Sequence, residues 1–353
     1  MFVILILFIL LYQTNSLPDF YKNSTEINER VKLLHYYYPD TTRLYSEEIN
    51  GYEVLAIRIG YYLNKNTHIP LLDEQFKILI VCGQHARELI SPELCMRLLE
   101  ENLNEFVLPD KRLDIMFVPL IDPWGRDEVF KGRYCQRTNS NGVYLNRNWE
   151  NCFYNIEDES ENTYYYASSK KGGEEYPGRF MWDQPETHFL LKITSGGGIQ
   201  GPPDLLINIH SGAQMVLYPY DGTEKIDVKH KDLHHIIALE TREAADCVNE
   251  CQIGPGSKIL YRSIGTFMDS VSFSYYNTLA FTWEIFNGFA LNRNEIEEDR
   301  FSDYSHCFTQ FNPKSETTYN NVLKNWVNAY KRVIKIIFKI IDRKKNHKKS
   351  RND

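Results

Sequence analysis

The chain has 353 residues, of which 42% are hydrophobic and 25% are charged, and its formal net charge is −7. This length and apolar content are enough for one large α/β domain or for two ordinary domains. An acidic chain lacks the broad basic face that nucleic-acid binding requires, so no nucleic-acid partner is expected.

The first sixteen residues, MFVILILFILLYQTNS, contain an apolar run over residues 2–11, followed by the small residues Thr14 and Ser16. A membrane-spanning helix needs about 20 apolar residues. The run is too short for that and favours a cleaved signal peptide over residues 1–16, with an uncleaved anchor as the alternative. The sequence therefore predicts a secreted protein without stable membrane insertion.

Short apolar runs alternate with helical patterns along the chain. Strands are expected at residues 77–82, 115–120, 205–209 and 279–283, and helices at residues 92–103 and 235–248. Ser91 before Pro92 is a favourable helix start, because serine caps free amides and proline suits the first turn. The polar, Tyr-rich and Gly-rich stretch 151–203 predicts long surface loops around one short helix. The alternation predicts a single α/β domain, with helices on both faces of its sheet.

Apolar residues at helical spacing between residues 322 and 341 predict a final helix that packs on the core. Residues 343–353 follow as a basic C-terminal tail. A solvated tail is expected there, and binding to an anionic surface is the alternative.

Secretion favours disulfide bonds among the seven cysteines. The stronger predicted pair is Cys135–Cys152, which flanks one loop, and the second is Cys247–Cys251, four residues apart. Cys82 is expected to be a buried thiol at the end of a strand. The states of Cys95 and Cys307 are left open.

Two of the predicted strands lead into histidines. His85 and Glu88 follow the first of these strands, and His210 ends the other. Ligands gather beyond the carboxyl ends of strands in open α/β sheets, and residues three apart on a turn can face one point. Two imidazoles and one carboxylate suit a catalytic zinc with an open position for water. Taken singly, His85 is better explained as a locally hydrogen-bonded loop residue and His210 as a satisfied strand-end residue, so the combination carries the hypothesis.

A third predicted strand, TLAFTW, runs into Glu284. A carboxylate here is either a surface residue where the strand emerges or a general base beside a metal-bound water. Arg137 and the run Asn146-Arg147-Asn148-Trp149 offer donors for a substrate carboxylate. Solvated surface arginines are the alternative.

Four motifs now carry a family resemblance: GQHAREL, GVYLNRNW, INIHS followed by LYPY, and FTWEI. In this order they resemble the zinc carboxypeptidases of the pancreatic carboxypeptidase A type, whose second motif reads GVDLNRNW. Weaker similarity covers residues 176–187 and 260–269. The resemblance spans roughly residues 19 to 342, and residues 17–342 are expected to form the catalytic domain.

The resemblance implies a mixed, roughly eight-stranded twisted sheet between helices. It also implies one zinc ion bound by His85, Glu88 and His210. Glu284 would be the general base, and Arg137 would polarise the scissile carbonyl. Substrate-binding roles carry over to Asn146, Arg147, Tyr261, Arg87, Ser211, Asp221 and Met268. Among these, Asn146 and Arg147 would hold the terminal carboxylate, and Tyr261 would cover the bound C-terminus.

The chain departs from the family pattern at Tyr144, where the family usually has an aspartate that hydrogen-bonds the first zinc histidine. Such carboxylates orient the imidazole, and their loss costs about 10–100-fold in metal affinity or activity. A phenol can accept the same bond, so weaker zinc binding is expected. The side-chain preference is left open, because Met268 points to apolar substrates and Asp221 to basic ones.

The sequence therefore predicts a secreted, monomeric zinc metallocarboxypeptidase that acts on the C-termini of peptides and proteins. Two other classes stay open. One is a catalytically impaired zinc- or peptide-binding protein on the same fold, and the other is a zinc amidohydrolase for small acylated amino acids. The surviving NRNW run and Tyr261 favour peptides.

Overall fold

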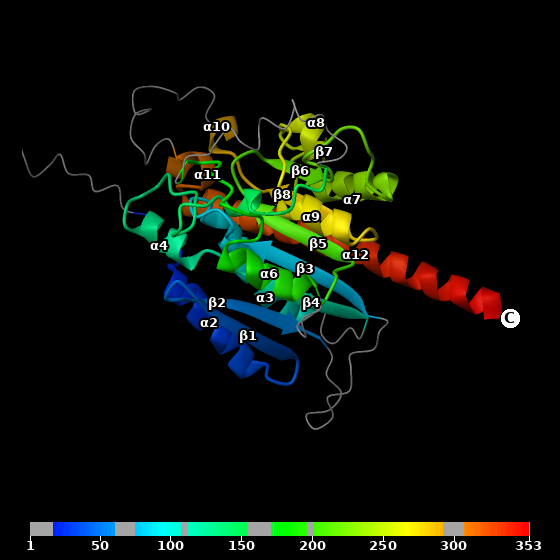
Figure 1. Cartoon of the computed structure of the whole chain (residues 1–353). Coiled ribbons are helices and arrows are strands. Elements are labelled where there is room, and N and C mark those ends of the chain that lie inside the picture. Colours follow the sequence, from blue (N-terminus) through cyan, green and yellow to red (C-terminus); the bar gives the residue numbers. More distant parts are fainter. Residues whose placement is uncertain are drawn as a thin grey trace, which may run out of the picture.

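A computed structural model describes residues 17–60, 75–106, 112–153, 171, 173–195, 201–291 and 307–352. The predicted signal peptide lies outside these residues. Eight strands of the described chain form one mixed sheet (Figure 1). Their order is β1 (Thr42–Ile49), β2 (Tyr52–Ile59), β4 (Leu113–Val118), β3 (Phe76–Cys82), β5 (Leu205–His210), β8 (Leu279–Glu284), β6 (Met215–Tyr218) and β7 (Gln252–Pro255). The predicted α/β class and strand number are confirmed.

The centre of the sheet is parallel. Strands β4, β3, β5 and β8 run in one direction, while β1 and β2, and β2 and β4, pair antiparallel, as do β6 and β8. Alternate side chains of β3 enter different cores: Ile78 and Ile80 lie in one cluster, and Leu79 and Val81 lie in the other. Both faces are therefore covered, which explains why these strands are almost continuously apolar.

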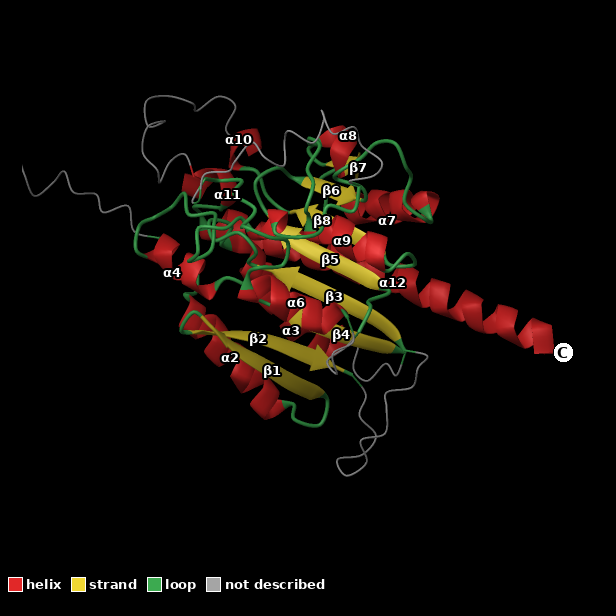
Figure 2. Cartoon of the chain, viewed as in Figure 1, coloured by secondary structure: helices red, strands yellow, loops and turns green. Residues whose placement is uncertain are grey.

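Helices cover both faces, as Figure 2 shows. One face is covered by α2 (Ser24–Tyr37), α3 (Ile90–Glu101), α7 (Lys231–Ala244) and α12 (Glu316–Asn352), and the other by α6 (Pro185–Thr194) and α9 (Phe267–Ser274). Shorter helical elements lie in the connections: η1 (Asn102–Phe106), α4 (Pro123–Phe130), η2 (Leu145–Arg147), α8 (Gly256–Ile259), α10 (Gly288–Leu291) and α11 (Thr309–Phe311).

The predicted final helix is α12, which packs on the core through Trp326, Tyr330, Val333 and Ile337. Trp326 Nε1 also donates to the carbonyl of Ile285 at 2.9 Å. The helix continues through the predicted basic tail, and its C-terminal end projects beyond the body in Figure 1. Within the described residues, none of the helices combines the length and apolarity that crossing a bilayer requires.

Two predicted helix starts differ from the structure. Helix α3 begins at Ile90, and Ser91 lies within its first turn, where its hydroxyl donates to the carbonyl of Glu88. The expected serine cap is wrong because a distant residue, Asn312, accepts the bond from the Ile90 amide at 3.0 Å. Helix α7 begins four residues before the predicted start at residue 235.

The predicted Cys135–Cys152 disulfide is wrong, because Cys135 is bonded to Cys307. Cys152 is a partly buried free thiol. The fold brings residue 307 back beside the loop that contains Cys135, and proximity in sequence did not indicate this. The predicted Cys247–Cys251 disulfide is confirmed. Cys82 is a buried free thiol, as expected, and so is Cys95.

Candidate metal centre

The candidate residues gather at the carboxyl edge of the parallel strands. His85 lies three residues after the end of β3, His210 is the last residue of β5, and Glu284 is the last residue of β8. Since β5 is hydrogen-bonded to both β3 and β8, these three chain segments emerge side by side. The sheet therefore brings together residues that are about 200 positions apart in the sequence.

His85, Glu88 and His210 converge on one point. His85 Nδ1 lies 2.6 Å from Glu88 Oε1, and His210 Nδ1 lies 3.1 Å from Glu88 Oε2. The two Nδ1 atoms are 3.1 Å apart, and all three side chains are buried. Four-coordinate zinc, with bonds of about 2.0–2.2 Å, places its ligand atoms slightly more than 3 Å apart. Two of the three distances, both 3.1 Å, are close to this spacing, and the donor set fits a zinc ion.

The electrostatics of His85 and Glu88 suit metal binding. Burial lowers the pKa of His85 well below its usual value, which keeps this imidazole neutral. Burial alone would raise the pKa of Glu88, but the neighbouring imidazoles of His85 and His210 outweigh it and lower that pKa, so Glu88 is ionised. A metal ion binds the deprotonated forms of these groups. Burial would lower the pKa of His210, but the nearby carboxylate of Glu88 outweighs it and raises that pKa.

The loop that carries His85 and Glu88 is fixed by close packing. Gly83 has φ +68°, and a Cβ there would lie 2.7 Å from Leu120 Cδ1, so a larger residue is excluded. The Ser211 amide donates to Glu88 Oε2 at 3.0 Å and holds the carboxylate from the neighbouring strand. Asn312 Nδ2 donates to the carbonyl of Arg87 at 2.8 Å. These contacts hold Glu88 in place for metal binding.

Glu284 lies beside the metal-binding residues and is largely desolvated. Its Oε2 is buried and has no hydrogen-bond partner among the described residues. Burial and the nearby Glu88 raise the pKa of Glu284 to about 7, against the opposing effect of His210 and Arg137. A carboxylate that titrates near neutrality can both accept and return a proton.

Arg137 and Tyr144 form a close pair at the edge of the centre. Arg137 Nη1 lies 3.8 Å from Glu88 Oε1, and Arg137 Nη2 donates to the Tyr144 hydroxyl. The Tyr144 hydroxyl therefore serves Arg137 and not the imidazole of His85. His85 Nε2 is buried and has no hydrogen-bond partner in the described part of the chain, and the same holds for His210 Nε2.

Arg147 and Asn146 belong to the short helix η2. Arg147 is 8% exposed, and its Nη2 donates to the Tyr261 hydroxyl at 3.3 Å. Asn146 Oδ1 accepts from the amide of Phe267 at 2.9 Å, which ties η2 to the start of α9. Tyr261 itself is 46% exposed, so its ring lies at the surface next to a buried guanidinium.

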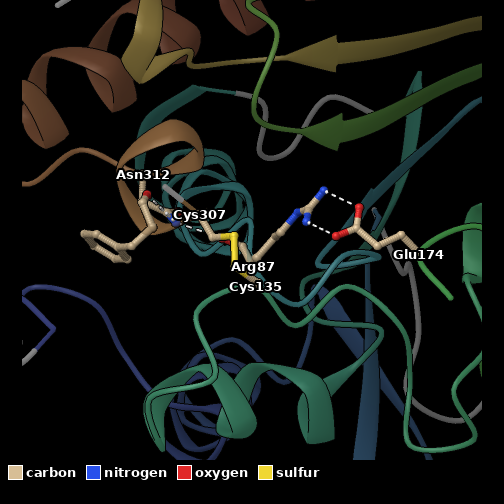
Figure 3. The surroundings of a disulfide bond; sticks show 6 residues. Arg87, Cys135, Glu174, Cys307 and Asn312 are labelled. Atoms are coloured by element: carbon tan, nitrogen blue, oxygen red, sulfur yellow. Dashed lines mark hydrogen bonds and ion pairs between the residues drawn. A yellow bond between two sulfur atoms is a disulfide. The ribbon is translucent and has the colours of Figure 1, made fainter. Parts of the chain in front are cut away.

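Arg87 has partners on several sides. Its guanidinium pairs with Glu174 at 3.1 Å (Figure 3). It also stacks on the ring of Phe311 at 4.4 Å. The Cys135–Cys307 disulfide lies beside this arrangement and anchors the segment that carries Phe311 and Asn312.

The remaining predicted site residues differ in their surroundings. Ser211 is 1% exposed, and its hydroxyl donates to the carbonyl of Phe311 at 2.6 Å, so the side chain is used within the protein. Met268 belongs to α9 and is buried in the core, where its sulfur accepts from the Thr282 hydroxyl. Asp221 is 8% exposed, and its carboxylate interacts electrostatically with Arg147 and His210.

Comparison with known proteins identifies the family. Residues 27–303 match the family model described as zinc carboxypeptidase. This chain belongs to the zinc carboxypeptidase family. His85, Glu88 and His210 are the zinc-binding triad typical of that family, so the expected cofactor is confirmed as zinc.

Individual relatives of this zinc carboxypeptidase family member are distant. The chain is 30% identical to the carboxypeptidase N catalytic chain of Rattus norvegicus over 211 residues, which cover 53% of this chain and 42% of the relative. It is 26% identical to Rattus norvegicus carboxypeptidase B over 244 residues, which cover 63% and 55%. The chain therefore spans about half the length of the curated relatives it matches.

The fold is shared with a solved structure, that of bovine thrombin-activatable fibrinolysis inhibitor in complex with tick carboxypeptidase inhibitor. The TM-score is 0.68 at 19% identity, and the match covers 90% of this chain and 98% of that one.

Several supporting residues could not be found from the sequence. Asn312, Phe311 and Glu174 hold the zinc-binding loop, yet none of them lies in a recognisable motif. Each acts on a loop more than 80 residues away in the sequence, and no local pattern indicates such contacts.

Proposed function

We propose that this protein is a secreted zinc-dependent carboxypeptidase that removes single residues from the C-terminal ends of peptides and proteins. The observation that carries this proposal is the buried His85–Glu88–His210 centre, with Glu284 as the register partner of His210 and Arg137 Nη1 3.8 Å from Glu88 Oε1. This arrangement would supply a metal site, a base and a cationic group close together.

The chain's own groups then have distinct roles. Bound zinc would polarise the scissile carbonyl and lower the pKa of water. Glu284 takes a proton from the attacking water and returns it to the leaving amine, a task suited to a carboxyl whose pKa lies near 7. Arg137, whose Nη1 lies 3.8 Å from Glu88 Oε1, would stabilise the oxygen that becomes negatively charged through its fixed positive charge.

Exopeptidase behaviour would come from Arg147, Asn146 and Tyr261. The guanidinium of Arg147 offers paired donors for a terminal carboxylate, and its burial strengthens that bond. Tyr261 lies next to it at the surface and would cover the bound residue. A peptide without a free C-terminus leaves the cation of Arg147 unpaired, which disfavours internal cleavage.

We further propose that basic C-terminal residues are preferred. Met268 and Asp221 indicate different preferences, apolar and basic respectively. Met268 is buried against Thr282. Asp221 interacts electrostatically with Arg147 and His210. An anionic group beside the site favours a Lys or Arg side chain and disfavours an apolar one.

Secretion is supported by the apolar N-terminal run and by the two disulfide bonds, which persist in oxidising compartments. The catalytic domain is assigned to residues 17–342, and the monomeric state stays a prediction. The alternative, a zinc- or peptide-binding protein with impaired catalysis, is favoured by one observation, the unpartnered Nε2 of His85 among the described residues.

The decisive experiment is a digest of a mixed peptide library by the purified protein, with and without a zinc chelator. We expect trimming of single C-terminal residues that stops when the metal is removed and resumes when zinc is added. Internal cleavage, trimming that persists in chelator, or no cleavage by the zinc-loaded protein would contradict the proposal. The residues released also report the side-chain preference.

A further inference from the structure

We propose that Tyr144 is a positioning residue that holds Arg137 and Arg147 on one aromatic ring, at the cost of the hydrogen bond that would otherwise support His85. The proposal rests on the proposed carboxypeptidase function, since it concerns how the two arginines are prepared for a substrate.

The geometry around Tyr144 is unusual for a buried aromatic residue. Its ring is 2% exposed and has two guanidinium groups over it, with the Cζ atoms of Arg137 and Arg147 at 4.2 and 4.7 Å from the ring centroid. Cations within about 6 Å of a tyrosine ring are attracted by its π electrons, most strongly where water is excluded. The Tyr144 hydroxyl accepts a further bond from Arg137.

Tyr144 is itself held firmly in place. Its amide donates to the carbonyl of Tyr176 at 2.7 Å, and its own carbonyl accepts from the amide of Arg147 at 2.9 Å. The ring and Arg147 therefore belong to one backbone turn. This turn fixes the backbone positions from which the ring and the guanidinium extend.

An uncharged ring has a specific advantage at this position. Arg137 and Arg147 carry like charges in a buried place, and a carboxylate between them would hold them together but would neutralise part of their charge. The tyrosine ring attracts both guanidiniums and leaves their positive charge available. A substrate carboxylate and a developing oxyanion therefore meet two cations already in position.

With tyrosine at position 144, the zinc-binding residue His85 lacks a hydrogen-bond acceptor for its Nε2 within the part of the chain that the structure describes. The rings of His85 and Tyr144 lie 4.9 Å apart, so Tyr144 occupies space next to the imidazole. Since His85 directs Nδ1 to the metal, its Nε2 carries the proton, and this buried N–H has no acceptor in the described residues. Such outer partners of a ligating histidine are worth about 10–100-fold in metal affinity or activity.

Three substitutions separate these effects. Tyr144→Phe keeps the ring and removes the hydroxyl, Tyr144→Leu removes the ring, and Tyr144→Asp places an acceptor near His85 Nε2. Tyr330→Leu is the matched control, because Tyr330 is a buried tyrosine on α12 that packs in the core and bonds Asn102. Three readouts apply to each variant: KM and kcat, zinc affinity of the apo protein by chelator competition, and peptide binding. Peptide binding compares a short peptide that has a free C-terminus with its amidated form, by calorimetry on the metal-free protein.

Tyr144→Leu is expected to weaken binding of the free C-terminus by about 10-fold and to raise KM similarly, while the amidated peptide is unaffected. Tyr144→Phe is expected to keep binding within about threefold and to lower kcat, since only Arg137 loses a bond. Tyr144→Asp is expected to tighten zinc binding by about 10-fold or more. Tyr330→Leu should change none of these three.

The proposal is overturned if Tyr144→Leu binds the free C-terminus as the unsubstituted protein does, or if Tyr144→Phe weakens it as much as Leu. It is also overturned if Tyr144→Asp binds zinc no more tightly. If Tyr144→Leu does not fold, the Phe and Asp variants decide the outcome. The binding measurements need no turnover. A protein that fails to hydrolyse peptides would therefore contradict the proposed function, while the role of Tyr144 would still be decided by the binding measurements.

Discussion

His210 and Glu284 are register partners, each the last residue of its strand, on the neighbouring parallel strands β5 and β8. A zinc ligand and the proposed base are thus set side by side by backbone hydrogen bonds of the central sheet. Such a placement tolerates little movement, because both strands are buried on both faces. Because the strand backbones are held in this way, a change of the Glu284 side chain should leave the backbone of His210 in place.

Glu284→Gln should lower kcat by about 100- to 10,000-fold, because the amide cannot accept the proton of the attacking water. The zinc content should stay unchanged, since Glu284 is not one of the three ligands. Steady-state kinetics and metal analysis of the same preparation test this. Glu240→Gln, at an exposed ion pair with Arg332, is the control. Substantial turnover by the Gln variant would refute the base assignment.

Arg147→Ala should raise KM by about 10–100-fold for peptides with a free C-terminus, because a buried charge-assisted bond is lost. Any weak activity on amidated peptides should be unaffected. Arg332→Ala, which removes a half-exposed arginine on α12, serves as the control. Equal losses on free and amidated substrates would argue against a carboxylate clamp at this position.

Asp221→Asn should reduce the preference for C-terminal lysine over leucine by about 10-fold, because the proposed site loses a negative charge. In the unsubstituted protein burial raises the pKa of Asp221 to about 6. The carboxylate is ionised above this pH and neutral below it, so the lysine preference should grow as the pH rises from 5 to 7. Ratios of kcat/KM for paired substrates measure both effects. A preference that is independent of pH and of the substitution would exclude Asp221 as its source.

Asp122→Asn should stabilise the protein at pH 8 by about 1–3 kcal/mol. Asp122 caps α4 by accepting from the Gly125 amide, but burial and nearby Glu186 raise its pKa well above the usual value. A raised folded-state pKa means that stability falls as the pH rises above the unfolded pKa of about 4. Asparagine keeps the cap and removes that fall. Urea denaturation at pH 4 and pH 8 tests this: the gain should vanish at pH 4, and no gain at pH 8 would contradict it.

The parts of the fold that could be predicted are those with a local signal. The apolar runs of β3, β5 and β8 identified the central sheet, and the residues that follow them identified the metal site. This worked because parallel strands deliver their carboxyl ends to one edge. Helix α12 was predicted for a different reason: its apolar residues recur at helical spacing over a long stretch.

The parts that could not be predicted depend on contacts between distant segments. The predicted partner of Cys135 was wrong because the true partner, Cys307, lies 172 residues away in the sequence, whereas Cys152 is nearer. The predicted Ser91 cap was wrong because Asn312, far away in the sequence, accepts the hydrogen bond from the first amide of the helix. The role of Tyr144 was hidden as well, since no sequence pattern shows that two arginines will stack on one ring.

The bracing of the zinc-binding loop by residues 307–312 has a consequence for biosynthesis. The metal ligands, the base and both arginines are all translated before Cys307 emerges from the ribosome. A chain that stops short of that residue lacks the disulfide, the Phe311 ring and the Asn312 amide that contact the zinc-binding loop or its neighbour. These supports of the loop are therefore the last to be synthesised.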